Sequence, residues 1–266
     1  MFANVLEYKA NACEAITFKL SMTIYFHGLV RTVFDVTLAD SFKPEMTHQI
    51  FGPKEIIFGY KNLSVNILCL AGSLETFVDT EYASKISTKL AKGTEPHDIL
   101  ESLTKSYEFE LIKTRADFES KVIQEIHFKP FGTVRNKYTS DNGSKSFSIY
   151  YIEPGMEDFE EFKVLHKRMQ SFLPFFVDGA SFIDSDDSQW CYYTLYESYF
   201  SEMDVPCFAF VGFMTVYKFY AYPESIRPRI SQVLILPPFQ KQGHGTQFVQ
   251  TFYNDFVPVS KVLDIA

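Results

Sequence analysis

Hydrophobic positions in the second half of the chain recur at two spacings, which predict strands and helices in turn. Residues 147–152 form a short apolar run typical of a strand. Large apolar side chains then recur every three or four positions from residue 159 to residue 176, which is the pattern of an amphipathic helix. Pro174 is expected to kink or weaken the last turn of this helix, because proline has no backbone N–H to donate.

Three more strands, a second helix and the start of a further strand are predicted after this helix. They are expected at residues 190–196, 208–220, 232–236, 246–256 and 262–265. Gly212, inside the second of these strands, indicates a bulge or a close approach of two backbones. The strand at 232–236 is almost wholly apolar, as expected for a strand that is buried on both faces.

The first half of the chain has a mixed pattern of strands and a helix. Residues 65–70 and 76–82 are expected to be strands, and residues 117–126 a helix with Asp117 as its candidate N-cap. The polar run at 139–145 is the most plausible break, either a domain boundary or a hairpin loop. We therefore expect a mixed α+β fold in two domains, residues 1–138 and 139–266.

Charge and cysteine usage narrow the classes of partner and compartment. The formal net charge of −8 makes nucleic acid an unlikely direct partner and favours a basic peptide. The four cysteines are scattered without paired spacing, which argues against a zinc site or a disulfide framework and fits a reducing compartment. His27, Arg31 and Asp35 interrupt the apolar stretch at 22–38, so neither a membrane span nor a signal peptide is expected.

The segment from Gln240 to Thr246 carries the sharpest motif, Gln-Lys-Gln-Gly-His-Gly-Thr. Its glycines allow positive φ and close approach of a ligand, and the helix that follows begins with unpaired N–H groups that suit phosphate oxygens. A dinucleotide fingerprint fits poorly, because Phe248 stands where its third glycine belongs, although Asp264 lies at about the expected distance for its acid. A phosphate-binding loop and a plain glycine turn remain as alternatives.

Longer segments resemble the type B histone acetyltransferases of the GNAT superfamily, whose pyrophosphate loop carries Gln-x-x-Gly-x-Gly. The segments that carry the resemblance are 44–52, 58–61, 71–74, 81–85, 128–132, 180–184, Trp190, 213–223, 227–236 and 239–245. It extends from Glu7 to the last residue and is weak at 21–40. The resemblance implies a family-specific α+β domain followed by a GNAT core, whose mostly antiparallel central sheet is flanked by helices.

An acetyl-coenzyme A site is implied along the strand and loop at the centre of this resemblance, without a metal. Its expected residues are Val233, Leu234, Ile235, Gln240, Lys241, Gln242, Gly243, His244, Gly245 and Thr246. A backbone N–H near Leu234 or Ile235 would stabilise the thioester oxygen as it becomes negative, although these residues also suit an ordinary core strand. Lys241 would meet a phosphate or only water, and the side chain of His244 is expected at the loop surface.

Acetyl transfer to lysine needs a carboxylate, because the amine has an ordinary pKa of about 10.4 and must lose a proton. In the family this acid is a glutamate shortly after the Leu-Asp-Ile segment, and the chain ends at Ala266, so we expect a catalytic region that is incomplete at its C-terminus. Asp178 corresponds to a second acid of the same cleft, or is a solvated carboxylate at a helix end. The acidic turn is expected to be solvated, and its members are Asp184, Asp186 and Asp187.

The resemblance also implies a groove for a histone tail and a corner of acidic residues. The residues expected to contact the tail are Glu55, Tyr217, Lys218 and Phe219. Pro53 and Lys54 replace two acids of that corner, which leaves only Glu55. The expected function is acetylation of lysines in a newly made core histone tail.

A WD-repeat histone-binding subunit is the implied partner, and the nucleus and cytoplasm are the implied locations. One alternative is a module that binds coenzyme A or a histone tail without catalysis, because the expected general base lies beyond Ala266. The other alternative is a GNAT enzyme that acts on a small amine.

Overall fold

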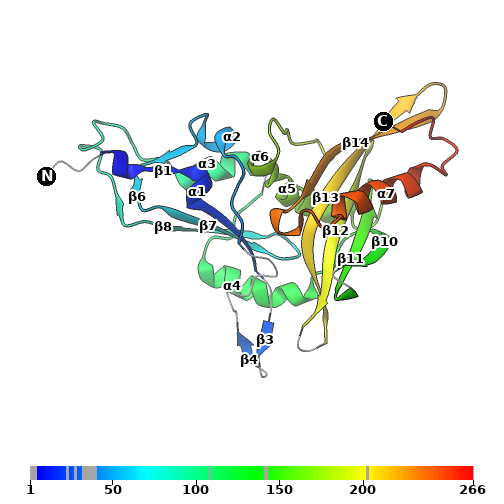
Figure 1. Cartoon of the computed structure of the whole chain (residues 1–266), viewed down its shortest axis with the longest axis horizontal. Coiled ribbons are helices and arrows are strands. Elements are labelled where there is room, and N and C mark those ends of the chain that lie inside the picture. The colour runs from blue at the N-terminus through cyan, green and yellow to red at the C-terminus, as the bar shows by residue number, and fades with distance from the viewer. Residues whose placement is uncertain are drawn as a thin grey trace.

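The computed structural model describes residues 5–21, 24–26, 29–31, 41–107, 109–140, 143–201 and 204–265 (Figure 1). Most of the apolar stretch at 22–38, and of the weakly matching patch at 21–40, lies outside the described residues. Within the described ranges, no helix is long and apolar enough to cross a membrane.

The elements up to His127 form the part of the molecule that we call the N-terminal part. They are η1 (Val5–Tyr8), β1 (Lys9–Asn11), α1 (Ala12–Ala15), β2 (Ile16–Ser21), β3 (Ile24–Phe26), β4 (Leu29–Arg31), α2 (His48–Phe51), β5 (Ile56–Phe58), β6 (Tyr60–Lys61), β7 (Ser64–Leu70), β8 (Thr76–Glu81), β9 (Ser84–Lys85), α3 (Ile99–Ser106), α4 (Arg115–Gln124) and η2 (Glu125–His127). Strand β7 is central in a sheet of order β2-β7-β8. The strands predicted at 65–70 and 76–82 are thus confirmed as β7 and β8.

Helix α4 begins earlier than predicted, because Thr114 and not Asp117 is its N-cap. The Oγ1 atom of Thr114 accepts a hydrogen bond from the backbone N of Asp117 at 3.1 Å and donates one to its carboxylate at 2.6 Å. Asp117 therefore lies in the first turn, where its negative charge is favourable beside the positive end of the helix. The prediction of Asp117 as the cap was wrong because the threonine supplies the same kind of acceptor one turn earlier.

The C-terminal part is built on one five-stranded antiparallel sheet of order β10-β11-β12-β13-β14. Its elements are β10 (Thr133–Ser140), β11 (Lys145–Ile152), α5 (Phe159–Gln170), α6 (Leu173–Phe176), β12 (Trp190–Phe200), β13 (Pro206–Ala221), β14 (Ser225–Ile235), η4 (Pro237–Phe239) and α7 (His244–Phe256). The run at 139–145 joins β10 to β11, which confirms the hairpin-loop alternative. The division into two domains stays a prediction; β10 begins at Thr133, before the predicted boundary, and belongs to this sheet.

Helices cover both faces of the sheet, as expected for a GNAT core (Figure 1). On one face, Phe162 of α5 packs against Tyr192 of β12, with ring centroids 5.0 Å apart. On the other face, Asp255 of α7 accepts a hydrogen bond from the hydroxyl of Tyr193 at 2.9 Å. Successive side chains of a strand point to opposite faces, so Tyr192 and Tyr193 place α5 and α7 on opposite sides. The mixed fold with a flanked antiparallel sheet is confirmed.

The helix predicted over 159–176 is interrupted after Gln170 and continues as the short helix α6. Pro174 lies in the first turn of α6, where a missing N–H removes no hydrogen bond from the helix. Phe175 and Phe176 of α6 pack around Phe18 of β2, with ring centroids 5.0 and 5.8 Å from it. Helix α6 therefore joins the core of the C-terminal part to that of the N-terminal part.

Strand β14 lies at the edge of the sheet, so the prediction of a strand buried on both faces was wrong. Its side chains alternate, with Leu234 only 4% exposed and Val233 41% exposed. Ser231 and Gln232 form a bulge, because Met214 pairs with Val233 while Val216 pairs with Ile230. Of the strand predicted at 262–265, the structure contains a single parallel bridge between Val262 and Ile226.

Gly212 meets both conditions that were predicted for it. The pairing of β12 with β13 shifts beside it, between Leu195 and Tyr196. A Cβ atom at position 212 would overlap the carbonyl oxygen of Leu234 in β14. Glycine at this position therefore allows β13 and β14 to approach each other.

His166 of α5 is fully buried and makes the stability of the fold dependent on pH. Burial lowers the pKa of its imidazole to about 3, from an ordinary value of 6.5. The folded state keeps His166 neutral, whereas the unfolded chain binds a proton below pH 6.5, so stability is present above that pH and is lost as the pH falls towards 3.

We expect acidification from pH 7 to pH 5 to cost about 2 kcal/mol through this residue. Urea unfolding of the wild type and of His166→Phe at both pH values measures the effect. The variant has a ring that does not titrate, so it should lose about 2 kcal/mol less than the wild type over this interval. Equal losses in the two proteins would contradict the assignment.

Candidate functional site

The loop at 240–246 connects the edge strand β14 to helix α7. Phe239 of η4 is 2% exposed and anchors the start of the loop in the core. Lys241 and Gly243 both have positive φ, of 61° and 86°, and Gly243 is the N-cap of α7 without a side-chain cap. The two positive-φ positions turn the chain sharply from the sheet into the helix.

Residues 241–246, apart from the buried His244, are at least partly exposed. Within the described residues, none of these groups donates to a protein acceptor, and the first that does beyond them is Gln247 N, to Gly243 O at 3.2 Å. A Cβ atom added at Gly243 or Gly245 would meet nothing within 4 Å. A row of free amides at the positive end of a helix is a ready site for an anion such as a diphosphate.

The glutamine side chains of the loop stabilise it from within. Gln240 Nε2 donates to Ile235 O at 2.9 Å, and Gln242 Nε2 donates to Pro238 O at 3.0 Å. These two predicted coenzyme ligands are thus tied to the loop backbone through their side chains. Lys241 and Thr246 are exposed and have no such tie.

The side chain of His244 is buried, which contradicts the expectation that it lies at the loop surface. It is 1% exposed, its Nδ1 lies 2.8 Å from the hydroxyl of Tyr138, and its ring lies 4.5 Å from that of Phe147. Burial, with a smaller effect of Lys145, lowers the pKa of the imidazole. His244 is the first residue of α7, and its buried side chain anchors the helix on β10 and β11.

The C-terminal end of β14 offers a free backbone edge beside this loop. Leu236 N donates to Val211 O at 2.9 Å, towards β13. N–H groups alternate in direction along a strand, so the N–H of Ile235 points away from β13. The carbonyl of Ile235 points the same way, towards the side chain of Gln240. Of the two predicted donors for a thioester oxygen, Ile235 therefore has the suitable direction.

An aromatic cavity of about 350 Å³ lies on the face of the sheet that α5 covers. Its lining residues are Trp190, Tyr217, Phe219, Arg229, Ile230 and Ser231. Tyr217 is central, with ring centroids 4.8 Å from Trp190 and 4.6 Å from Phe219. Its hydroxyl donates to Asp187 at 3.0 Å, which raises the pKa of the phenol. The structure thus brings Tyr217 and Phe219 together, as the resemblance implied.

Lys218 points to the opposite face of the sheet from this cavity. Its Nζ lies 2.6 Å from Glu153 Oε2, and neighbouring residues of a strand alternate between the two faces. Lys218 is therefore absent from the cavity that Tyr217 and Phe219 line. The sequence motif alone did not separate the three residues.

The acidic turn is engaged with neighbouring side chains. Asp186 pairs with Lys163 at 2.9 Å, and Asp184 accepts a hydrogen bond from the backbone N of Asp186 at 2.9 Å. Asp187 accepts the hydroxyl of Tyr217 and places a negative charge at the aromatic cavity. Asp187 is partly exposed, whereas Asp184 and Asp186 are exposed.

Glu55 holds the N-terminus of α2. Its Oε1 accepts a hydrogen bond from Thr47 N at 2.5 Å, which is the main reason that the pKa of its carboxyl is lowered. Cys13 Sγ donates to the same oxygen at 3.6 Å. One carboxylate oxygen is thus used inside the protein, so a contact with a histone tail through Glu55 stays a prediction that depends on the other oxygen.

Asp178 lies directly after α6 and is exposed. Its Oδ1 is 3.1 Å from His48 Nε2, and 77% of its side chain is accessible. The segment that follows reaches β14, where Ser181 O accepts a hydrogen bond from Gln232 Nε2 at 2.8 Å. Asp178 therefore lies three residues before Ser181, which contacts the bulge beside Val233. The structure shows no direct contact between Asp178 and the loop at 240–246.

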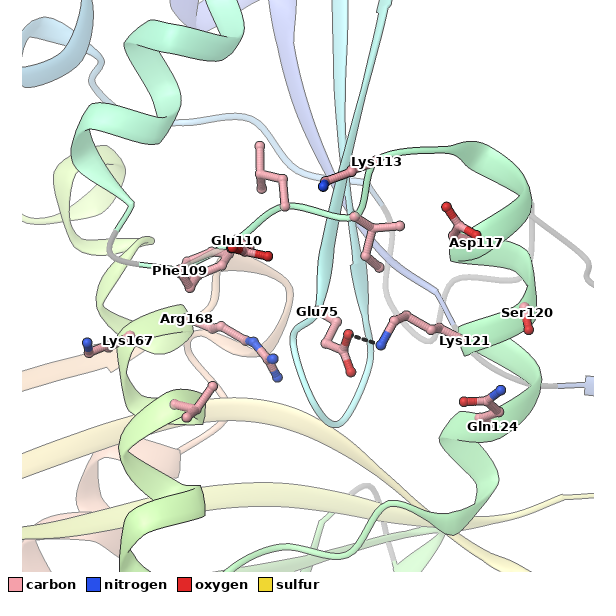
Figure 2. A pocket seen from close by; sticks show the side chains of 13 residues that line it. Glu75, Phe109, Glu110, Lys113, Asp117, Ser120, Lys121, Gln124, Lys167 and Arg168 are labelled. Atoms are coloured by element: carbon pink, nitrogen blue, oxygen red, sulfur yellow. Dashed lines mark ion pairs between the residues drawn. The ribbon is translucent and has the colours of Figure 1, made fainter.

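The largest of the cavities described, about 680 Å³, lies elsewhere, between α4, the segment 109–113 and α5 (Figure 2). Figure 2 shows Glu75 paired with Lys121 across it and Arg168 reaching in from α5. Arg168 donates to Ser73 O at 2.9 Å, and burial lowers the pKa of its guanidinium. Positive and negative side chains alternate around this cavity, and it contains none of the predicted site residues, so we assign it no ligand.

Sequence reasoning missed several contacts of the site that come from strand register. Trp190 and Arg229 both pair with Tyr217, which places all three in the aromatic cavity. His48 is brought to Asp178 by packing of α2 against α6. Among the described residues, no group of histidine, cysteine or acidic side chains is arranged to hold a metal ion.

Comparison with known proteins identifies the relatives of this chain. A family model described as histone acetyl transferase HAT1 N-terminus matches residues 8–178. Histone acetyltransferase type B catalytic subunits from Rattus norvegicus and Homo sapiens are each 39% identical to it over 264 residues, covering 97% of this chain and 60% of the relative. The subunit from Schizosaccharomyces pombe is 33% identical over 228 residues, covering 84% of this chain and 54% of the relative.

The chain thus spans about 60% of the length of the mammalian relatives that it matches. Among solved structures, a possible acetyltransferase from Clostridium difficile 630 covers 44% of this chain and 76% of its own, with 11% identity and a TM-score of 0.28.

Proposed function

Because the chain belongs to the histone acetyl transferase HAT1 N-terminus family, we propose that it binds acetyl-coenzyme A and transfers the acetyl group to lysines of a newly made core histone tail. The observation that carries this proposal is the row of open amides at 241–246, next to the free edge of β14. The names of the relatives support the reaction class.

The residues of the loop fit the diphosphate of coenzyme A. Donors are needed there, and the loop offers free N–H groups at the N-terminus of the 13-residue helix α7. Lys241 adds an exposed positive charge, and no acidic residue occurs between Leu236 and Phe248. The carrier supplies a reactive thioester, and in this proposal the backbone N–H of Ile235 holds its oxygen as negative charge develops.

The aromatic cavity fits the aliphatic part of a lysine side chain. The rings of Trp190 and Tyr217 offer apolar walls to the methylene groups, and Asp187 supplies negative charge at the Tyr217 hydroxyl. The net charge of −8 favours approach of a basic peptide. We therefore propose that this cavity binds a side chain of the histone tail, with Phe219 at its exposed side.

In the reaction, the amine nitrogen of the lysine forms a bond to the thioester carbon, the carbon–sulfur bond breaks, and the amine proton passes to a carboxylate directly or through water. We propose that Asp178 is one such acid of this site. The family resemblance extends the proposal to a WD-repeat histone-binding partner and to the nucleus and cytoplasm. The described cysteines are all free, which supports a reducing compartment.

The test is acetyl transfer by this chain to a core histone tail peptide, with a polyamine as the competing acceptor. We expect the peptide to be acetylated and the polyamine to be a poor acceptor. Turnover of the polyamine alone would contradict the histone assignment. If the chain binds coenzyme A but transfers acetyl to neither acceptor, the result would contradict the enzyme assignment and support a non-catalytic binding module.

A further inference from the structure

His48 links the N-terminal part of the molecule to Asp178, an acid of the proposed acetyl-transfer site. Its Nε2 lies 3.1 Å from Asp178 Oδ1, with 38% of the imidazole side chain exposed. The two atoms lie within ion-pair distance of each other. This contact joins residues that are far apart in the sequence, one in α2 and one just after α6.

Backbone contacts hold His48 and Asp178 in place on both sides of this ion-pair contact. Glu45 N and Met46 N both donate to Phe175 O, at 3.0 and 3.1 Å. Gln49 Nε2 donates to Val177 O at 3.4 Å. Residues 45–49 thus follow the end of α6 closely, and His48 is carried by a segment that is already docked.

The N-terminus of α2, which carries His48, is held by Glu55. Thr47 is fully buried, and its backbone N and hydroxyl both donate to Glu55. His48 also acts electrostatically on Glu55, contributing in a minor way to the lowered pKa of that carboxyl. The imidazole therefore lies near two acids, and Asp178 is the one that it contacts at ion-pair distance.

From Asp178 the chain runs directly to the edge of the sheet. Ser181 is held by Gln232, which belongs to the bulge next to Val233. A carboxylate at position 178 is free to rotate unless a partner restrains it, because 77% of its side chain is exposed. His48 is the partner that the structure provides.

We propose that His48 is a positioning residue for acetyl transfer, which orients the Asp178 carboxylate to receive the proton of the acceptor amine. This inference rests on the proposed function. An exposed ion pair contributes little to stability, so the effect of removing it falls on the geometry of Asp178 rather than on the fold. The N-terminal part thereby contributes a side chain to the site on the C-terminal sheet.

The experiment measures kcat, and KM for acetyl-coenzyme A, with a histone tail peptide as acceptor. His48→Leu is expected to lower kcat about 10-fold and to leave this KM unchanged. His48→Gln places a neutral donor close to the position of Nε2 and is expected to restore kcat to within about 2-fold of the wild type. The double variant His48→Leu/Asp178→Asn should be no slower than Asp178→Asn alone, because the two residues act through one interaction.

Lys105→Leu is the matched control, since it removes an exposed ion pair, with Glu101 at 2.8 Å on α3, far from these residues in sequence. It should leave kcat unchanged. An unchanged kcat in His48→Leu, or effects of the two single variants that multiply in the double variant, would overturn the inference while the proposed function stands. A wild-type chain that acetylates no peptide would overturn the proposed function, and the positioning role with it.

Discussion

Replacing Gly245 with aspartate is expected to weaken coenzyme A binding at least about 100-fold while the protein stays folded. Gly245 lies in the first turn of α7, and an added Cβ atom would meet nothing within 4 Å, so the side chain creates no clash. An aspartate there even favours the helix, because its negative charge lies at the positive end. The same charge opposes the diphosphate, and the side chain occupies the space beside the open amides.

Calorimetric titration of coenzyme A into the folded variant measures this effect. Gly245→Ala is the matched control: it adds the Cβ atom without charge, and should keep affinity within a few-fold while stabilising the helix by about 0.5–1 kcal/mol. Gly243→Asp is a weaker test, because Gly243 has a φ of 86° and any side chain there strains the backbone. Unchanged affinity in a folded Gly245→Asp protein would refute the loop assignment.

Replacing Gly212 with valine is expected to destabilise the protein by about 2–4 kcal/mol. The new Cβ atom would overlap the carbonyl oxygen of Leu234, which is backbone and has no alternative rotamer. Strands β13 and β14 must separate locally, so Leu234 and Ile235 move and coenzyme affinity falls as well.

Urea unfolding gives the free energy, and a coenzyme titration of the folded fraction gives the affinity. Gly245→Ala serves again as the control, as a glycine substitution with open space around it. A loss of stability below about 1 kcal/mol in Gly212→Val would show that the two strands tolerate a side chain between them, contrary to the packing described.

Helices α4, α5 and α7, strands β7, β8 and β11 to β14, and the loop could be predicted from the sequence because their signals are local. The apolar periodicity of α5, the glycines of 240–246 and the short apolar runs depend only on nearby residues. The close approach of two backbones at Gly212 could also be predicted. A glycine inside an apolar strand usually marks either a bulge or such an approach.

The features that the sequence did not show depend on register and on long-range packing. The side chain of His244 is flanked by glycines in the sequence, yet Tyr138 on β10 provides a buried hydrogen-bond partner for it. Val233 is exposed because β14 is an edge strand, and strand order is not encoded in local hydrophobicity. Lys218 and Tyr217 were grouped by motif, although strand alternation sends them to opposite faces.

Contacts between distant segments were the least accessible to sequence reasoning. His48 and Asp178 meet only because α2 docks on the end of α6. Glu55 was expected to face a ligand, but its lowered pKa and its hydrogen bond from Thr47 come from a local turn that holds α2. Such roles become visible only when the partner of each polar atom is known.

The binding of coenzyme A to free backbone N–H groups is tested most directly by amide NMR. Coenzyme A is titrated into isotope-labelled protein, and the chemical shift of each backbone amide is followed. Our account predicts that the largest changes fall on residues 241–246, with a second group at 233–235. Saturable binding that leaves those amides unshifted and moves a different surface would contradict it.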